Sequence, residues 1–78
     1  MEATDRELIQ KYMLTDVTLE RLYREHNKLE DMISRYSTRS FLTDEEQAEV
    51  RKLKKRKLSG VDRMMSIVER YRTTASMI

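Results

Sequence analysis

The sequence contains no cysteine, no proline, no tryptophan and a single glycine among its 78 residues. Without cysteine, a disulfide framework and thiolate metal sites are excluded. Without proline, and with abundant Leu, Glu, Lys and Arg, the composition is typical of long helices. No apolar run approaches the roughly 20 residues that span a bilayer, and the first residues lack the apolar stretch of a secretory signal. These absences predict a cytoplasmic, all-α protein.

Recognisable catalytic motifs are also missing. The chain has no glycine-rich phosphate loop and no nucleophile near a histidine, and it has only one histidine in total. A two-helix scaffold offers no pocket for a pair of catalytic carboxylates. We therefore expect no enzyme activity, no catalytic residue, no cofactor and no bound metal.

Apolar residues recur at steps of three and four on both sides of a polar segment near residue 40. This spacing places them on one stripe of each of two helices, which is the pattern of helix-on-helix packing. The first stripe contains Leu8, Tyr12, Leu19, Leu22, Leu29, Ile33 and Tyr36, and the second contains Val50, Leu53, Met64, Ile67 and Tyr71, widened by Leu58, Val61, Met65 and Val68. The pattern predicts one domain over residues 1–78, an antiparallel two-helix hairpin that packs like a coiled coil.

Capping signals predict where each helix begins. Thr4 followed by Glu7, and Thr43 followed by Glu46, are candidate capping boxes in which two side chains satisfy backbone amides at a helix start. The expected elements are a first helix over about 4–36, a turn over about 37–43, a second helix over about 44–72 and a frayed tail over 73–78. An alternative remains open at Thr15 and Asp16, where a capping residue could start a new helix and leave 4–14 as a separate arm.

The short turn requires the two helices to run antiparallel, and this sets the pairs that meet. Folding the chain about residue 40 brings together the pairs Leu29 with Val50 and Leu53, Leu22 with Leu58, Leu19 with Val61, Glu25 with Arg56, and Glu30 with Lys54. Opposite charges beside the seam contribute little stability, but they help to select this register.

Two polar residues interrupt the apolar seam. His26 falls between Leu22 and Leu29, and Lys57 falls on the seam of the second helix. A single polar residue at such a position typically fixes register or oligomeric state, and we favour this role for both. For His26 two alternatives remain: a zinc site with carboxylates across a symmetric dimer, and protonation near neutral pH that makes association pH-sensitive.

Six of the seven residues from Arg51 to Lys57 are cationic. A nucleic-acid interface would use Arg51, Lys52, Lys54, Lys55 and Arg56. These side chains point nearly all round a helix, however, and the net charge of the chain is only +2. A solvated face partly paired with acids of the first helix is the preferred interpretation. A role at membrane surfaces is disfavoured because the second helix has no Trp or Phe.

A lone hairpin of this length buries little apolar surface, so its stability should be marginal. We therefore expect the chain to associate with itself as a dimer or a four-helix bundle, with another helical protein as the alternative partner. The residues expected in the seam or the oligomer are Leu19, Leu22, His26, Leu29, Ile33, Val50, Leu53, Lys57, Leu58, Val61, Met64 and Val68.

Two segments also carry a family resemblance. The segment from His26 to Ile33 reads His-Asn-Lys-Leu-Glu-Asp-Met-Ile, and Leu53 to Leu58 reads Leu-Lys-Lys-Arg-Lys-Leu, with Asp62 following. Over about 19–68 the chain resembles the YdcH-like family of short bacterial proteins of unknown function. The resemblance implies an antiparallel helical hairpin and brings no catalytic residue or cofactor.

Overall fold

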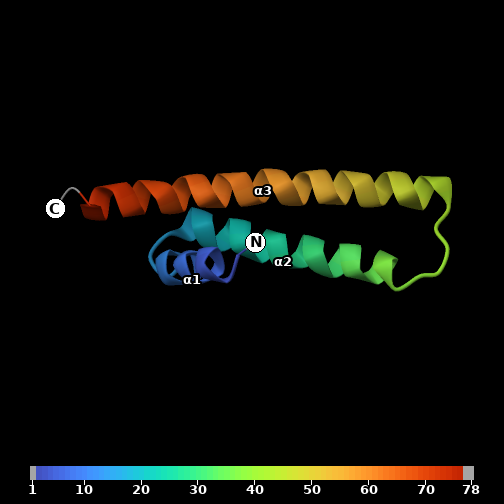
Figure 1. Ribbon diagram of the computed structural model, residues 1–78, viewed down its shortest axis with the longest axis horizontal. Helices are drawn as coiled ribbons and strands as arrows, with labels where there is room; N and C mark the ends of the chain where they lie inside the picture. Colours follow the sequence, from blue (N-terminus) through green and yellow to red (C-terminus); the bar gives the residue numbers. More distant parts are fainter. Residues whose placement is uncertain (1, 77–78) are drawn as a thin grey trace.

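The computed structural model describes residues 2–76, which form three helices: α1 (Ala3–Tyr12), α2 (Val17–Ser37) and α3 (Asp44–Ser76). In Figure 1, α2 and α3 run antiparallel along the length of the molecule, and α1 lies beside them at the end far from the turn. No strand occurs in this part of the chain, so the predicted all-α class is confirmed. None of its helices has the length and apolar character needed to cross a membrane.

The predicted continuous first helix is wrong, because the chain breaks after Tyr12 and restarts at Val17. Asp16 has extended backbone, and its side chain accepts a hydrogen bond of 2.9 Å from the backbone N–H of Leu19. The alternative with a new helix after Asp16 is therefore correct. The predicted capping box at Thr4 is also wrong. Helix α1 already begins at Ala3, after Glu2, which makes no side-chain cap.

The start of α3 follows the sequence prediction. The backbone N–H of Thr43 donates to Glu46 Oε1 at 3.0 Å, and the N–H of Glu46 donates to Thr43 Oγ1 at 3.1 Å. This reciprocal pair confirms the second capping box. Helix α3 is longer than the predicted second helix over about 44–72, since it continues to Ser76 and so includes the described part of the tail predicted over 73–78. No proline or glycine interrupts the helix there, and residues 77–78 lie outside the described part.

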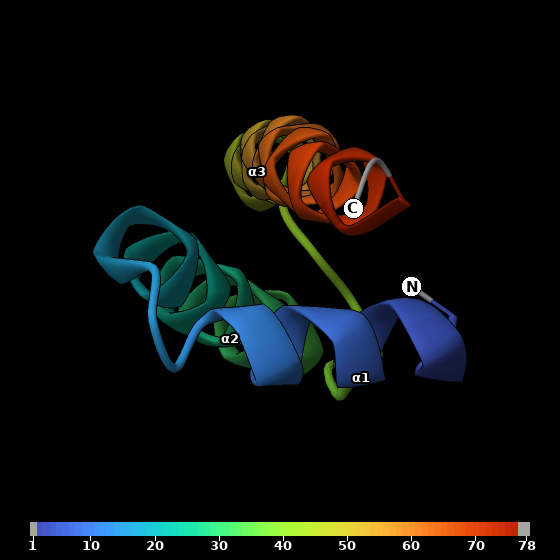
Figure 2. The same cartoon turned by 90° about the vertical axis from the view of Figure 1, so that its left-hand side faces the viewer.

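The core is concentrated where α1 packs against the hairpin. Viewed along the hairpin, α1 lies to one side of the plane through α2 and α3 (Figure 2). The buried side chains there are Ile9, Leu19, Met64, Ile67 and Val68. The rings of Tyr12 and Tyr71 stack at 4.7 Å between centroids, and the Tyr71 hydroxyl donates to Asp16 Oδ2 at 2.6 Å. These contacts tie α1 and the start of α2 to the last turns of α3.

The other half of the hairpin, toward the turn, is packed much less. From residue 30 to residue 52 no side chain is buried. Five apolar residues in this stretch are only half-buried, namely Ile33, Tyr36, Leu42, Ala48 and Val50, and Phe41 is 80% exposed. Two helices alone cannot enclose an apolar stripe on all sides, and no third element covers this end.

Candidate functional site

Most of the residues predicted to lie in the seam are buried or half-buried in the structure. Six of its residues are buried, namely Leu19, His26, Leu29, Leu53, Met64 and Val68, and five are half-buried, namely Leu22, Ile33, Val50, Lys57 and Val61. The placement of Leu58 in the seam is wrong, because its side chain is 63% exposed. Five residues after Leu53, it has turned about 140° away from the seam at 3.6 residues per turn.

The predicted register is correct at one charged pair and shifted at the other. Arg56 Nη2 lies 2.8 Å from Glu25 Oε1, as expected. The predicted pairing of Glu30 with Lys54 is wrong: the nearest helix-α3 cation to Glu30 Oε1 is Lys57, with Nζ at 3.7 Å. Lys57 is one turn further along the helix than Lys54, so both belong to nearly the same face.

The expected contact of Leu22 with Leu58 is replaced as well. Leu22 lines a hollow together with Ser59, Gly60 and Arg63. A Cβ placed on Gly60 would meet no atom within 4 Å, so the glycine leaves an open notch in α3.

His26 is the only buried polar residue in the described part of the chain, with 5% of its surface exposed. Its Nε2 lies 3.4 Å from Glu30 Oε1, and its Nδ1 has no hydrogen-bond partner. Burial lowers the pKa of His26 because it disfavours the charged imidazolium. The Glu30 carboxylate acts in the opposite direction, and Lys57 lowers this pKa further. Within residues 2–76 no group of three potential metal ligands comes together.

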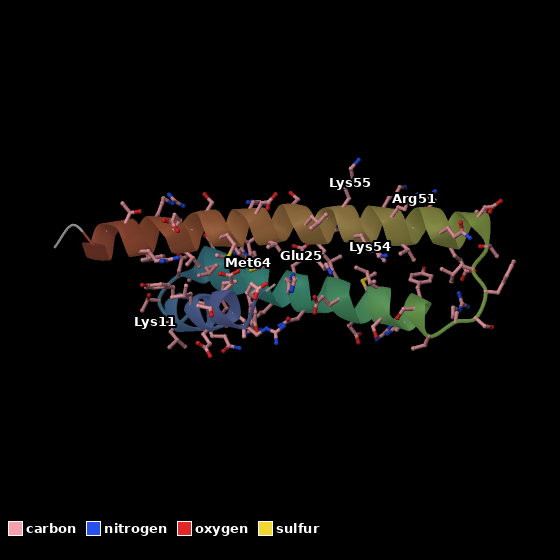
Figure 3. All side chains as sticks on the ribbon, viewed as in Figure 1. Lys11, Glu25, Arg51, Lys54, Lys55 and Met64 are labelled. Atoms are coloured by element: carbon pink, nitrogen blue, oxygen red, sulfur yellow. The ribbon has the colours of Figure 1, made fainter. Side chains whose placement is uncertain are left out.

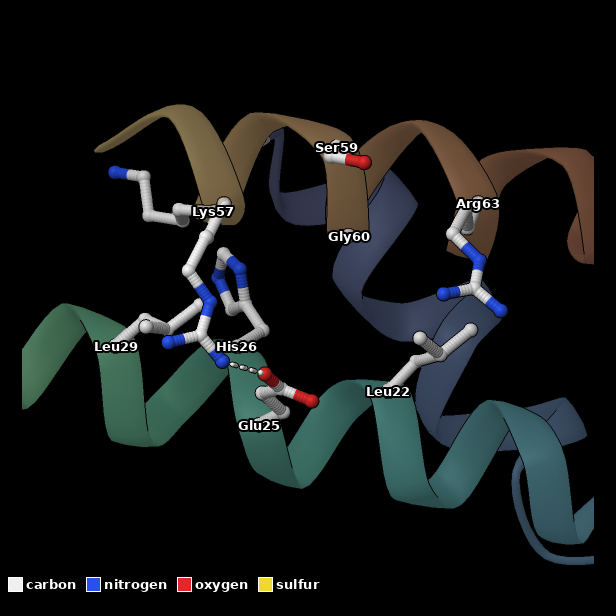
Figure 4. Close-up of a pocket in the computed structure, with 9 residues that line it drawn as sticks. Leu22, Glu25, His26, Leu29, Lys57, Ser59, Gly60 and Arg63 are labelled. Carbon is white, nitrogen blue, oxygen red and sulfur yellow. Dashed lines mark hydrogen bonds and ion pairs between the residues drawn. The ribbon is translucent and has the colours of Figure 1, made fainter. Parts of the chain in front are cut away.

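Two adjoining hollows form a groove on the face of the hairpin opposite α1. Figure 4 shows the first, with α1 behind the two long helices. We call both together the basic groove; its lining residues are Arg21, Leu22, Arg24, Glu25, His26, Lys28, Leu29 and Met32 from α2, and Arg56, Lys57, Ser59, Gly60 and Arg63 from α3. The hollows share Glu25, Leu29 and Arg56, so they are continuous.

The groove carries an excess of positive charge over an apolar floor. Of its cations, Arg24 pairs with Glu20 at 2.8 Å and Arg56 pairs with Glu25. Among the described residues, Arg21, Lys28 and Arg63 lie within ion-pair distance of no carboxylate. Unpaired guanidinium and ammonium groups beside a hollow favour an anionic occupant.

The cations of the groove are mostly not those that the basic run indicated. Of the predicted nucleic-acid residues, Arg51, Lys52, Lys54, Lys55 and Arg56, only Arg56 lines it. Figure 3 shows Lys55 pointing away from α2, on the outer side of α3. The run therefore does not form a single footprint. Sequence reasoning missed Arg21, Arg24, Lys28 and Arg63; a spacing of seven between Arg21 and Lys28, which puts them on one face, was the available signal.

Comparison with known proteins gives a family but no activity. No curated protein and no solved structure matches the chain. The model of a family described as "Protein of unknown function (DUF465)" matches residues 19–67. This segment is more than half of the chain and covers nearly all of α2, the turn and most of α3. The match agrees with the resemblance to YdcH-like proteins seen in the sequence. The chain belongs to the DUF465 family of proteins of unknown function.

Proposed function

We propose that this protein is a small, non-catalytic helical module that associates with a second copy of itself. One observation carries the proposal: no side chain is buried from residue 30 to residue 52. Helix α1 covers only the opposite half of the hairpin, where nearly all the fully buried side chains lie. The turn half of the hairpin, residues 30–52, has an apolar stripe that another helical surface would cover.

The exposed apolar side chains give this association an energetic basis. Phe41 is 80% exposed and adjoins the half-buried Leu42, while Ile33, Tyr36 and Val50 are half-buried on the neighbouring turns. Removing apolar surface from water contributes about 25 cal/mol per Å². Covering each turn half with a second copy converts two weakly packed hairpins into one four-helix bundle. Another helical protein could cover the same stripe. A second copy is the simplest partner because it carries the same uncovered apolar stripe.

Sedimentation equilibrium over a range of micromolar concentrations tests this proposal. We expect a reversible dimer, and we expect Phe41→Ser to weaken it without loss of helical circular dichroism, because Phe41 is largely exposed. Leu14→Ser is the matched control, since Leu14 is 82% exposed but lies at the break between α1 and α2. A folded wild-type monomer at every concentration would contradict the proposal, and so would equal weakening by the two substitutions.

A further inference from the structure

The face of the hairpin that carries the basic groove also carries acids a short distance away. Glu45 lies 18 residues before Arg63 and Glu49 lies seven residues before Arg56, which places both on the groove side of α3 at 3.6 residues per turn. Both are exposed, and neither has an ion pair within residues 2–76. The neighbouring Glu46 differs, because it pairs with Arg39 across the turn. The molecule therefore presents an acidic end at the turn and a basic groove further along.

We infer that the basic groove binds the acidic start of α3 from a second copy of this chain, and that the two copies do so reciprocally. The inference rests on the proposed self-association and names the surfaces that meet. Glu45 and Gly60 are 15 residues apart on α3, a separation of about 22 Å at 1.5 Å per residue. A two-fold axis level with Val50 to Leu53 would bring each of these positions opposite the other in the partner. Such an isologous contact uses the same patch on both copies and closes on itself.

Charge selects this arrangement over the other ways of laying two such faces together. If the two grooves faced each other directly, Arg21, Lys28 and Arg63 would lie close to the same three residues of the partner copy. Such contacts between like charges are unfavourable. An antiparallel contact with an offset places the carboxylates of Glu45 and Glu49 against the cations of the partner's groove. Because the net charge of the chain is only +2, the two copies repel each other little at long range.

The shapes of the two surfaces also match. The notch at Gly60 is open, with nothing within 4 Å of an added Cβ, and Leu22 and Leu29 lie on its other side. Phe41, three residues before Asp44, is exposed. In the reciprocal dimer the acidic turn carries Phe41 to the apolar floor of the groove while its carboxylates meet the cationic rim. An apolar anchor in a pocket, surrounded by charged pairs, is the common arrangement of a protein interface.

Charge reversal in two matched variants tests the inference. The groove variant carries Lys28→Glu and Arg63→Glu, and the acidic variant carries Glu45→Lys and Glu49→Lys. Each alone should raise the dimer Kd by about tenfold or more, because like charges then face each other in both halves of the contact. Mixed in equal amounts, the two should form a heterodimer close to the wild-type Kd, since opposite charges meet again in both halves. Analytical ultracentrifugation measures the affinities, and circular dichroism checks that each variant is folded.

The control variant carries Arg51→Glu and Lys55→Glu, which reverse the same number of charges without touching the groove lining. It should leave the Kd within about twofold. If the wild type dimerises but the groove and acidic variants do so equally well, or if their mixture is not restored, the inference fails while self-association stands. If the wild type is monomeric, both fail. Restoration in the mixture supports the inference, because a merely destabilised fold is not repaired by a partner.

Discussion

At the residue scale, His26 is the one polar side chain of the seam that is fully buried, since Lys57 is only half-buried. Its Nδ1 has no partner, and an unsatisfied buried acceptor costs about 1–3 kcal/mol. An apolar residue of similar size would avoid that cost. The histidine instead sits where α2 meets Lys57 and the Gly60 notch of α3, which favours its predicted role in fixing register over one in adding stability.

We expect the fold to lose stability as the pH falls through the histidine range. Burial lowers the pKa of His26 in the folded protein below its ordinary value of 6.5, so the unfolded chain binds the proton first. The contribution of neutral His26 is therefore complete above about pH 6.5 and declines below it, until the pH reaches the lower pKa of the folded state. Thermal unfolding followed by circular dichroism from pH 8 to pH 5 measures this loss.

His26→Gln is the control for the histidine titration, because glutamine keeps a polar group in the seam and does not titrate. Its melting temperature should change much less over the same pH window. Equal pH dependence in the variant and the wild type would show that other groups, such as the carboxylates, cause the loss.

At the scale of elements, the join between α1 and α2 depends on Asp16. Its carboxylate caps α2 and accepts the Tyr71 hydroxyl of α3, and these two hydrogen bonds, that of Tyr71 first, lower the pKa of Asp16. The same contact raises the pKa of Tyr71, because the hydroxyl proton is held by a carboxylate. One side chain thus begins one helix and attaches it to another.

Asp16→Ala should lower the free energy of unfolding by about 1–3 kcal/mol, through loss of the helix cap and of the charge-assisted hydrogen bond. Asp31→Ala is the control, since Asp31 lies on the same helix and makes only an exposed pair with Arg35; it should cost less than about 0.5 kcal/mol. Urea unfolding measures both values. Similar costs for the two variants would mean that the Asp16 contacts do not hold in solution.

The sequence predicted the parts of the elements that depend on local chemistry. The capping box at Thr43 and Glu46 and the burial of Leu29 and Leu53 follow from spacing alone. The break after Tyr12 was harder to predict, because Leu8 and Tyr12 stay in phase with the stripe that continues at Leu19. Periodicity does not detect a sharp change in chain direction, such as the one from α1 to α2, when the apolar stripe keeps the same phase. The capping residue Asp16 was the better guide.

The candidate site was predicted only in part, for a related reason. The contact of Arg56 with Glu25 follows from antiparallel heptads, but Lys54 and Lys57 lie one turn apart on one face, and spacing does not decide which of them meets Glu30. From the sequence alone, the cations of α2 are typical of a solvent-exposed helix face. Their grouping with Arg63 is a property of how the two helices pack, which only the tertiary structure shows.

At the scale of the whole molecule, we expect the charge distribution to give no tight nucleic-acid binding. The net charge is +2, the run from Arg51 to Lys57 surrounds its helix, and Glu25 and Glu30 lie close to Arg56 and Lys57. Non-specific affinities of about 10⁻⁴–10⁻⁶ M are the level expected at physiological salt.

Fluorescence anisotropy with labelled DNA and RNA at about 150 mM salt, where the Debye length is about 8 Å, checks this expectation. We expect no submicromolar binding, and we expect any weak binding to fall steeply as salt is added. Sequence-selective submicromolar binding would contradict the proposed function and give the basic run a role of its own.

Helix α1 also limits how far the proposed association can extend. A bare hairpin has two equivalent sides, and each could accept a neighbour, so such chains could stack one on the next without end. In this molecule α1 covers one side over the half far from the turn, where Ile9 and Tyr12 pack. The side opposite α1 is uncovered along the whole hairpin, and a reciprocal contact would bury it in both copies. If two copies associate as proposed, we therefore expect the ten residues of α1 to favour a closed dimer over stacking into filaments.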